Sequence, residues 1–458
     1  EGNYAEAIQN FDKSLSEPRT PEFTARALYW KAESEYSLNR FDDAIITYKQ
    51  FSQSDAAKGL PEQKEVNYNI AYTYFQRKNY DEAASYFDKY VKSNPADDVR
   101  LPDAYMRLGD SYFISSKYWP AMEAYNAAVS NGTSDRAYAT FQKAISYGFV
   151  DRNNQKIETL RTFDSDFPDS SFKDDALYEL GNTYVSMQRN SDAIAAYDRL
   201  IREIPNSKFV AKAMLKKALI FDNTSRSQDA LNLFKRVAEE FPGTPEGVQA
   251  VASAKLIYID MGRVDEYGRW ANNLDYVSVE DSELDDAAYA SAEKNFVDGD
   301  SGAAITQYEK YLRDYPTGQR ALEAHFRLGQ LYYAKEQYDR SMPHYNYVIS
   351  KERSEFTEEA ADRAGHERRG GVGSGGQAQL RLPGRSRREG GGAQEAAHLA
   401  GGLRALLRRL GGDAGGLRGR QPRQLGVPFA RAADGRHAPA GADHAIAVEG
   451  RPHGRRAA

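Results

Sequence analysis

The sequence predicts an all-α protein built as an α-α superhelix, a solenoid of stacked helix hairpins, followed by a low-complexity C-terminal tail. Three observations support this prediction. A small residue recurs at nearly constant intervals, apolar residues between the recurrences follow helical spacing, and prolines close the units. A fixed period of 20–50 residues is typical of repeat proteins, so we expect each hairpin to stack on the next.

The recurring small residue sets the register of the repeats. Its successive spacings are 39, 38 and 35 residues and then 37 residues five times. Two antiparallel helices approach closely only where one of them carries no bulky side chain, so this residue is expected at the helix crossing. The aligned positions are Ala32, Ala71, Gly109, Ala144, Gly181, Ala218, Lys255, Ala292 and Gly329.

One unit, residues 174–207, shows how each hairpin is expected to form. Leu177, Leu180 and Tyr184 share one helical face, and a second apolar face follows after Asn190. Proline then ends the second helix, because it lacks an amide donor and clashes with the preceding turn. The closing prolines are Pro95, Pro168, Pro205, Pro242 and Pro316.

This pattern resembles the tetratricopeptide repeat. Residues 67–95, 105–128 and 328–345 place small and aromatic residues at the family's spacing, and the likeness covers about 360 residues. The departures are a period nearer 37 than 34 residues, and larger residues at the family's second alanine of the second helix. The units around Ala144 and Lys255 are degenerate, with Lys156 and Tyr267 where the family has alanine.

The longer units are similar to those of bacterial envelope proteins, namely the lipoprotein of the β-barrel assembly machinery and the coordinator of the Tol–Pal system. That narrower resemblance implies a location in the bacterial cell envelope, in the periplasm or at the outer membrane, with a cytoplasmic location as the alternative. It also implies an alternative role, in which an outer-membrane or periplasmic assembly factor acts through edge contacts.

The resemblance implies a concave wall of first helices that binds protein or peptide partners. Aromatic residues at the family's groove positions are the candidate contacts, because aromatic side chains supply large contact area at low entropic cost. For each of them, packing between adjacent repeats is the alternative. The candidates are Tyr29, Tyr36, Tyr68, Tyr72, Phe75, Phe113, Phe141, Tyr178, Phe326 and Tyr333.

Composition argues against several other functions. The net charge of −5 combines about +10 from residue 364 onward with about −15 before it. Phosphate binding needs clustered Lys and Arg, so we expect no nucleic-acid groove in the acidic repeat region. No stretch is apolar for long enough to span a bilayer. Cysteine is absent, which excludes disulfides and thiolate chemistry.

We expect no catalytic residues, no metal site and no cofactor. The repeat region holds only two histidines, His325 and His344, on different predicted helices and without a third ligand at recognisable spacing. No nucleophile elbow or phosphate-binding loop is present. The expected function is a non-catalytic scaffold, and the alternative from another class is the substrate-recruiting part of a larger enzyme.

We divide the chain into a repeat array of nine to ten units at residues 1–361, beginning within a repeat, and a tail at residues 362–458. The tail is rich in Gly, Arg and Ala, and its composition favours disorder. An Arg/Gly segment that binds RNA or an anionic membrane and a flexible linker are two explanations. We favour a third, a shifted reading frame, because residues with GC-rich codons replace those with AT-rich codons.

Overall fold

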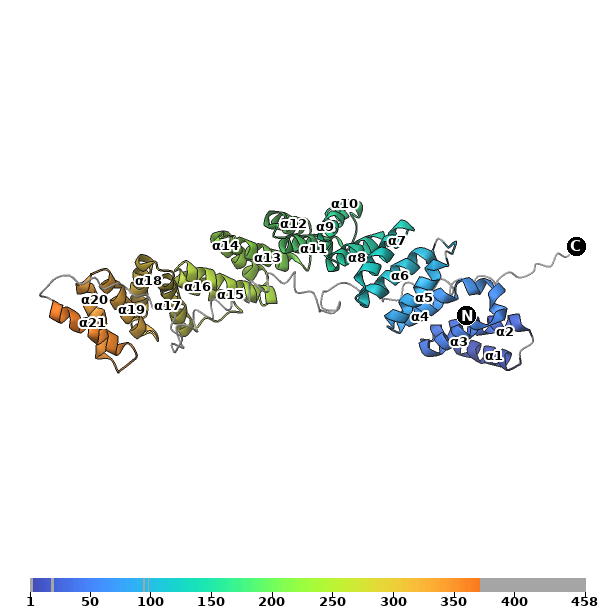
Figure 1. Cartoon of the computed structure of the whole chain (residues 1–458), viewed down its shortest axis with the longest axis horizontal. Coiled ribbons are helices and arrows are strands. Elements are labelled where there is room, and N and C mark those ends of the chain that lie inside the picture. The colour runs from blue at the N-terminus through green and yellow to red at the C-terminus, as the bar shows by residue number, and fades with distance from the viewer. Residues whose placement is uncertain (1–2, 18–19, 94, 98, 371–458) are drawn as a thin grey trace. The chain divides into compact units, whose positions relative to one another are not determined.

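The protein is all-α in a computed structural model that describes residues 3–17, 20–93, 95–97 and 99–370. These residues form α-helices, two short 3₁₀ helices and connecting turns, with no strand among them, so the predicted fold class is confirmed (Figure 1). The chain divides into two compact units between Ala196 and Tyr197, within α12 (Asn190–Glu203). Each unit is described by itself below.

In the N-terminal unit, helices alternate between the first and the second helix of a hairpin. The first helices are α2 (Pro21–Ser37), α4 (Val66–Gln76), α6 (Arg100–Ile114), α8 (Arg136–Phe149) and α11 (Lys173–Ser186). The others are α1 (Tyr4–Ser16), α3 (Phe41–Gln53), η1 (Asp55–Gly59), η2 (Pro61–Lys64), α5 (Tyr80–Lys92), α7 (Tyr118–Ser130), α9 (Asn153–Arg161), α10 (Phe163–Asp166) and the start of α12. Helices adjacent in sequence pack together, as in a solenoid.

The C-terminal unit continues the same alternation. Its first helices are α13 (Val210–Asn223), α15 (Pro245–Asp260), α17 (Asp281–Val297), α19 (Ala321–Ala334) and α21 (Thr357–Gly370). Its second helices are α14 (Ser227–Glu240), α16 (Val264–Ala271), α18 (Ser301–Asp314) and α20 (Tyr338–Ser350). The helix α21 extends past the predicted boundary at residue 361. The rest of the predicted tail, residues 371–458, lies outside the described residues.

The aligned position lies on a first helix in all nine hairpins from α2 to α20, as the sequence predicts, and it is Gly or Ala in eight of them and Lys255 in the other. At two of these positions the packing leaves no room for a side chain. A Cβ atom added to Gly109 would lie 2.7 Å from the Tyr125 ring, and one added to Gly329 would lie 2.7 Å from the Tyr345 ring. The small residue therefore admits an aromatic ring of the second helix at the crossing.

The turn inside each of these hairpins uses one left-handed residue. Seven of these nine residues are not glycine, although the conformation strains an L-residue, and they include Lys78, Gln188 and Glu336 with φ of 62°, 59° and 58°. Their main-chain N–H groups bond back to the first helix, as at Lys78, whose N–H donates to the Phe75 carbonyl at 2.9 Å. The turn thus closes the first helix and starts the second.

An arginine follows the left-handed residue in several hairpins, a regularity that our sequence reasoning missed. Arg189, Arg226 and Arg263 each donate through Nε to the carboxylate three residues later, at 2.7–2.8 Å. Arg226 also lies 4.2 Å from the ring centroid of Phe221 on the first helix. The arginine therefore ties the start of the second helix to the end of the first.

The predicted breaks and irregular units are present. All five closing prolines lie directly after a second helix or, at Pro168, after the short helix α10 that extends α9. The two units predicted to be degenerate have short second helices, α9 and α16, of nine and eight residues. In the first of them, the buried Lys156 donates to Glu179 at 2.8 Å, so a charged side chain occupies the position of the family's alanine.

Candidate functional site

The ten aromatic candidates all lie on first helices, as predicted. They occupy α2 (Tyr29, Tyr36), α4 (Tyr68, Tyr72, Phe75), α6 (Phe113), α8 (Phe141), α11 (Tyr178) and α19 (Phe326, Tyr333). The structure divides them by exposure. Those of α2–α11 belong to the N-terminal unit and those of α19 to the C-terminal unit, so they are compared within each unit.

Six of the candidates are buried, with exposed fractions of 4% or less. They are Tyr29, Tyr68, Tyr72, Phe113, Phe141 and Phe326. Their rings pack against the second helix or the next hairpin; Tyr29 lies 5.3 Å from Phe51, ring centroid to ring centroid. In the structure these six side chains pack within or between repeats, which is the alternative given above, and their contact with a partner stays a prediction.

The other four candidates, Tyr36, Phe75, Tyr178 and Tyr333, are only partly buried. Tyr36, Phe75 and Tyr333 lie four residues after the small residue, near the end of their first helices. Each packs against an aromatic ring that begins its second helix, as Phe75 does against Tyr80 at 5.4 Å. These rings are held in place and keep part of their surface accessible to solvent.

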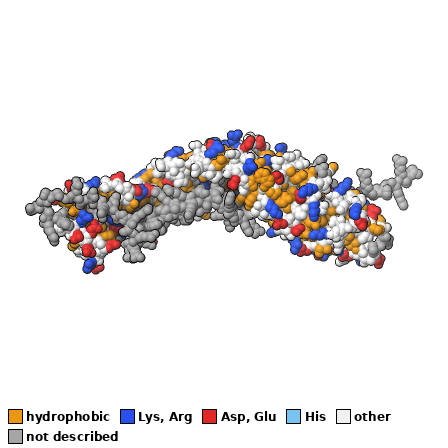
Figure 2. Space-filling model, viewed as in Figure 1, with side chains coloured by type: hydrophobic (Ala, Val, Ile, Leu, Met, Phe, Trp, Pro, Cys, Tyr) orange, Lys and Arg blue, Asp and Glu red, His pale blue; other side chains and the backbone are white. Residues whose placement is uncertain are grey.

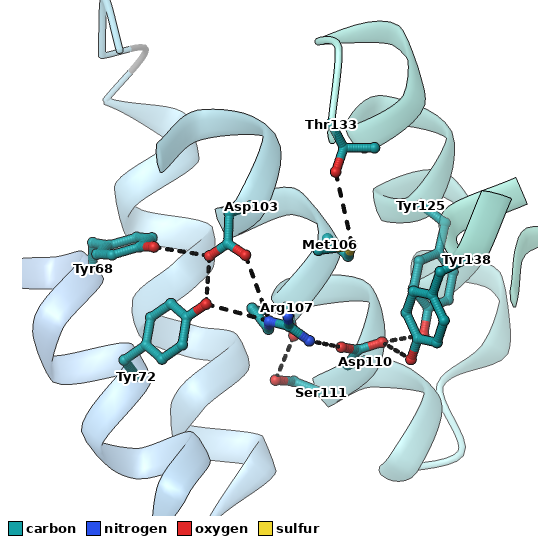
Figure 3. A network of polar contacts seen from close by, with 10 residues as sticks. All are labelled: Tyr68, Tyr72, Asp103, Met106, Arg107, Asp110, Ser111, Tyr125, Thr133 and Tyr138. Atoms are coloured by element: carbon teal, nitrogen blue, oxygen red, sulfur yellow. Dashed lines mark hydrogen bonds and ion pairs between the residues drawn. The ribbon is translucent and has the colours of Figure 1, made fainter. Parts of the chain in front are cut away.

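Beside Phe75, buried polar groups join α4 to α6 (Figure 3). The hydroxyls of Tyr68 and Tyr72 both donate to Oδ2 of Asp103, at 2.8 and 2.6 Å. Nε of Arg107 donates to the Tyr72 hydroxyl at 3.3 Å. The other oxygen of Asp103, Oδ1, lies 3.6 Å from Nε of Arg107, which is longer than a hydrogen bond. Oδ2 of Asp103 thus accepts two hydrogen bonds, whereas Oδ1 has only the longer contact with Arg107.

The same network continues from α6 into α7 and α8 (Figure 3). Asp110 is fully buried and accepts bonds from the hydroxyls of Tyr125 and Tyr138, at 2.9 and 2.7 Å. Nη1 of Arg107 donates to its second oxygen at 2.8 Å. Burial raises the pKa of Asp110, and Arg107 and the two hydroxyls oppose that rise by favouring the charged form. Three hydrogen-bond donors compensate the buried charge.

Our sequence reasoning missed this buried carboxylate, which recurs directly after the small residue in three hairpins. The three are Glu33, Asp110 and Glu293. Each accepts from a tyrosine of its second helix, and those tyrosines are Tyr48, Tyr125 and Tyr308. Each also accepts from the first helix of the following hairpin, through Asn69, Tyr138 and Arg327 respectively. An acidic residue on an otherwise apolar helix face is the signal that could have found it.

Glu33 is the most strongly perturbed carboxylate of this kind. Burial raises the pKa of Glu33 to about 7, and the hydrogen bond from Tyr48 opposes the rise. Nδ2 of Asn69 donates to the oxygen that Tyr48 also uses, at 2.6 Å. No basic side chain forms an ion pair with Glu33 among those that the structure gives for the described residues, so burial dominates.

A separate apolar area lies over α6 to α8, where Figure 2 shows hydrophobic side chains gathered on the visible face. Trp119 at the start of α7 is 45% exposed, which makes it one of the large exposed apolar side chains of this unit. Its Nε1 donates to Glu123 at 2.9 Å, and Arg152 lies over its ring at 5.6 Å. Trp119 itself lies on a second helix, outside the predicted wall of first helices.

Within residues 3–370, apart from the gaps named above, no group of three or more His, Cys, Asp or Glu residues is placed to hold a metal ion. Over the same part of the chain, no helix is both long and apolar enough to cross a membrane. The described site consists of aromatic rings and carboxylates locked by hydrogen bonds, an arrangement suited to recognition.

Comparisons with known proteins agree with the repeat pattern. Tetratricopeptide-repeat family models match residues 1–57, 64–97, 178–245 and 296–355. No curated protein sequence matches the chain.

Solved structures match at low identity. One is YrrB, described as a tetratricopeptide-repeat protein with an unusual peptide-binding site, at 20% identity and a TM-score of 0.35, over 43% of this chain and 93% of that one. A second is a tetratricopeptide-repeat protein from Parabacteroides merdae, at 14% identity and a TM-score of 0.36, over 66% of this chain and 97% of that one. A third contains Naa15 and Naa10 bound to HypK, at 14% identity and a TM-score of 0.45, over 80% of this chain and 59% of that one. We draw no functional conclusion from likeness at this level. The tetratricopeptide-repeat models thus match segments in both units of this chain, in agreement with the period and the hairpins.

Proposed function

We propose that the protein is a non-catalytic scaffold that binds a peptide or an extended segment of a protein partner along its first helices. The observation that carries this proposal is the partly exposed ring of Phe75, which lies 6.5 Å from the Tyr72 ring of the hydrogen-bonded network, centroid to centroid. Tyr36 adds a second partly exposed ring on the preceding first helix. Exposed aromatic rings on a rigid support are typical of binding hot spots, because little side-chain entropy is lost when a partner docks.

The polar network supports recognition of a main chain or a basic side chain. The Asp103 side chain is 19% exposed, and its Oδ1 has no neighbour within ordinary hydrogen-bond distance among the contacts that the structure gives. Tyr68 and Tyr72 hold the carboxylate through its other oxygen. A partner N–H or ammonium group that reached Oδ1 would gain a charge-assisted bond to an acceptor that is already oriented.

A peptide selection tests this function. We would select binders from a displayed random-peptide library against the full chain, and measure their affinity by fluorescence anisotropy. Phe75→Ala and Tyr36→Ala together should weaken binding at least tenfold, because each removes an aromatic anchor. Tyr36→Ala also removes the hydrogen bond between its hydroxyl and Gln76. Asp103→Asn should weaken peptides that present a basic group more than neutral ones.

The matched control is Trp119→Ala with Ile46→Ala, which removes exposed apolar side chains from second helices. It should leave the peptide affinity within twofold. Equal losses in both variants would contradict binding along the first helices, and so would a loss confined to the control. Far-UV circular dichroism confirms that each variant keeps its helix content.

The narrower predictions remain proposals. A location in the bacterial envelope, and assembly work through edge contacts there, rest on the resemblance alone, because none of the matches reported above carries them. Recruitment of substrate for a catalytic domain in a larger enzyme likewise remains an alternative. Fractionation of cells that express the gene from its own promoter tests the location directly.

A further inference from the structure

The C-terminal unit brings together the two histidines that the sequence separates by 19 residues. His325 lies on α19 and His344 on α20, and their Nδ1 atoms are 2.8 Å apart. Such a pair forms one hydrogen bond only if one ring carries a proton on Nδ1 and the other does not. The two rings meet nearly head-on, with centroids 5.1 Å apart, and imidazole nitrogens are also donors that late first-row metal ions prefer.

Stacked rings hold both imidazoles in this orientation. His325 stacks on Tyr347 with ring centroids 3.8 Å apart, and His344 stacks on Tyr332 with centroids 5.8 Å apart. The hydroxyl of Tyr332 donates to Glu309. Glu309 also accepts from Nη2 of Arg340 at 2.7 Å. The stacking therefore keeps the two imidazoles side by side before any ligand arrives.

The surroundings of the two rings lower the pKa of both imidazoles. Burial lowers the pKa of His325 to about 4, and His344 and Lys351 add to the effect. Burial also lowers the pKa of His344, where Arg340 reinforces the fall and Glu309 opposes it.

We propose that His325 and His344 form a two-ligand site for a late first-row divalent ion such as zinc, bound through both Nδ1 atoms across the α19–α20 hairpin. Bonds of 2.0–2.1 Å to two nitrogens place those nitrogens about 2.9 Å apart at a right angle and about 3.3 Å apart in a tetrahedron. The two Nδ1 atoms therefore need to move apart by about half an ångström at most, and both rings must turn so that their lone pairs converge on the ion. Water, or a donor from a bound partner, completes the coordination.

Binding changes the tautomer of one ring without changing its charge. In the hydrogen-bonded pair one ring has its proton on Nδ1; in the metal-bound pair both rings carry it on Nε2. The hydrogen bond and the metal thus compete for the same two atoms. Because the two ligands lie on the two helices of one hairpin, the ion would cross-link α19 and α20 and stabilise this part of the C-terminal unit.

Zinc binding by the full chain at pH 7.5 tests the proposal. Equilibrium dialysis with zinc chloride should show one more bound ion per chain for the native protein than for His325→Gln with His344→Gln. The sequence contains seven histidines, so five remain in the variant and act as an internal control for binding elsewhere. Each single substitution should weaken this site at least tenfold, and magnesium chloride should have no effect.

A second measurement works on the native protein and so does not depend on the variants folding. In protein labelled with ¹⁵N-histidine, zinc should shift the Nδ1 resonances of His325 and His344 together and leave both Nε2 atoms protonated. Equal zinc stoichiometry in the native protein and the double variant would overturn the proposal. Unchanged Nδ1 resonances at saturating zinc would overturn it as well, and would leave the pair as a hydrogen bond only.

Discussion

The hydroxyl of Tyr138 donates to the carboxylate of Asp110 across the junction between two hairpins, at 2.7 Å. Both side chains are buried, and the bond joins the first helix of one repeat to the first helix of the next. Neighbouring repeats are therefore coupled by a directional polar contact as well as by apolar packing. Breaking this contact should lower the free energy of unfolding, because the buried carboxylate of Asp110 cannot be solvated by water instead.

Tyr138→Phe should lower the free energy of unfolding of this region by about 1–3 kcal/mol, because it leaves a buried carboxylate with one donor fewer. Urea unfolding followed by circular dichroism measures the loss. Tyr147→Phe on the same helix is the matched control, since Tyr147 is partly exposed and its ring faces Lys143. A loss as large in the control would show that the effect comes from α8 in general.

Glu33 should make local stability depend on pH. Its folded pKa of about 7 lies above the ordinary value of 4.5, so the folded state binds the proton more tightly. The resulting stabilisation is complete below about pH 4.5 and is lost as the pH rises through 7, with a total of roughly 3 kcal/mol. Hydrogen exchange of the amides of α2 and α3, corrected for intrinsic rates, should show more protection at pH 5 than at pH 8.

Glu33→Gln should flatten this dependence between pH 5 and pH 8, because the amide stays neutral throughout. Glu82→Gln on the solvent side of α5 is the control and should leave the profile unchanged. If Glu33→Gln kept the native pH profile, some other group would have to carry the titration.

Lys78→Gly should raise stability by about 0.5–1 kcal/mol, because Lys78 occupies the left-handed region at φ 62° and glycine adopts it without strain. Lys78→Ala separates the loss of the side chain from the gain in backbone freedom, and we expect it to be close to neutral. Denaturant midpoints of the three proteins check the order. A glycine variant no more stable than the alanine variant would contradict strain at this turn.

Gly329→Ala should destabilise the α19–α20 hairpin by about 1–3 kcal/mol, since its methyl group would overlap the buried ring of Tyr345. Gly365→Ala in α21 is the matched substitution, because no atom lies within 4 Å of the added methyl there. It should be neutral or stabilising, as alanine favours a helix more than glycine does. Thermal unfolding of both variants provides the comparison.

The sequence was sufficient for the architecture because the small residue has one physical role. Wherever it recurs, two helices cross closely, so its period predicted the nine hairpins between α2 and α20 and placed every aromatic candidate on a first helix. The closing prolines were equally informative. Steric exclusion depends on residue size alone, which can be read from the sequence directly.

The exposure of the candidates could not be read in the same way. Tyr72 and Phe75 both lie on the face predicted to bind a partner, yet only Phe75 keeps accessible surface. The difference depends on the rotation of α4 against α6, and many side chains set that rotation jointly. The bond from Tyr138 to Asp110 and the histidine pair were missed for the same reason, since each joins side chains on different helices.

The carboxylates shared between hairpins limit how freely this chain's repeats can be exchanged. A hairpin transplanted beside a foreign neighbour would keep its acidic group but lose the tyrosine, asparagine or arginine that serves it from the next unit. Hybrids cut at the junction between α7 and α8 would therefore leave the buried Asp110 with two of its three donors, Arg107 and Tyr125. We therefore expect hairpins to be exchangeable where the buried carboxylate is transferred together with its hydrogen-bond donor from the next hairpin.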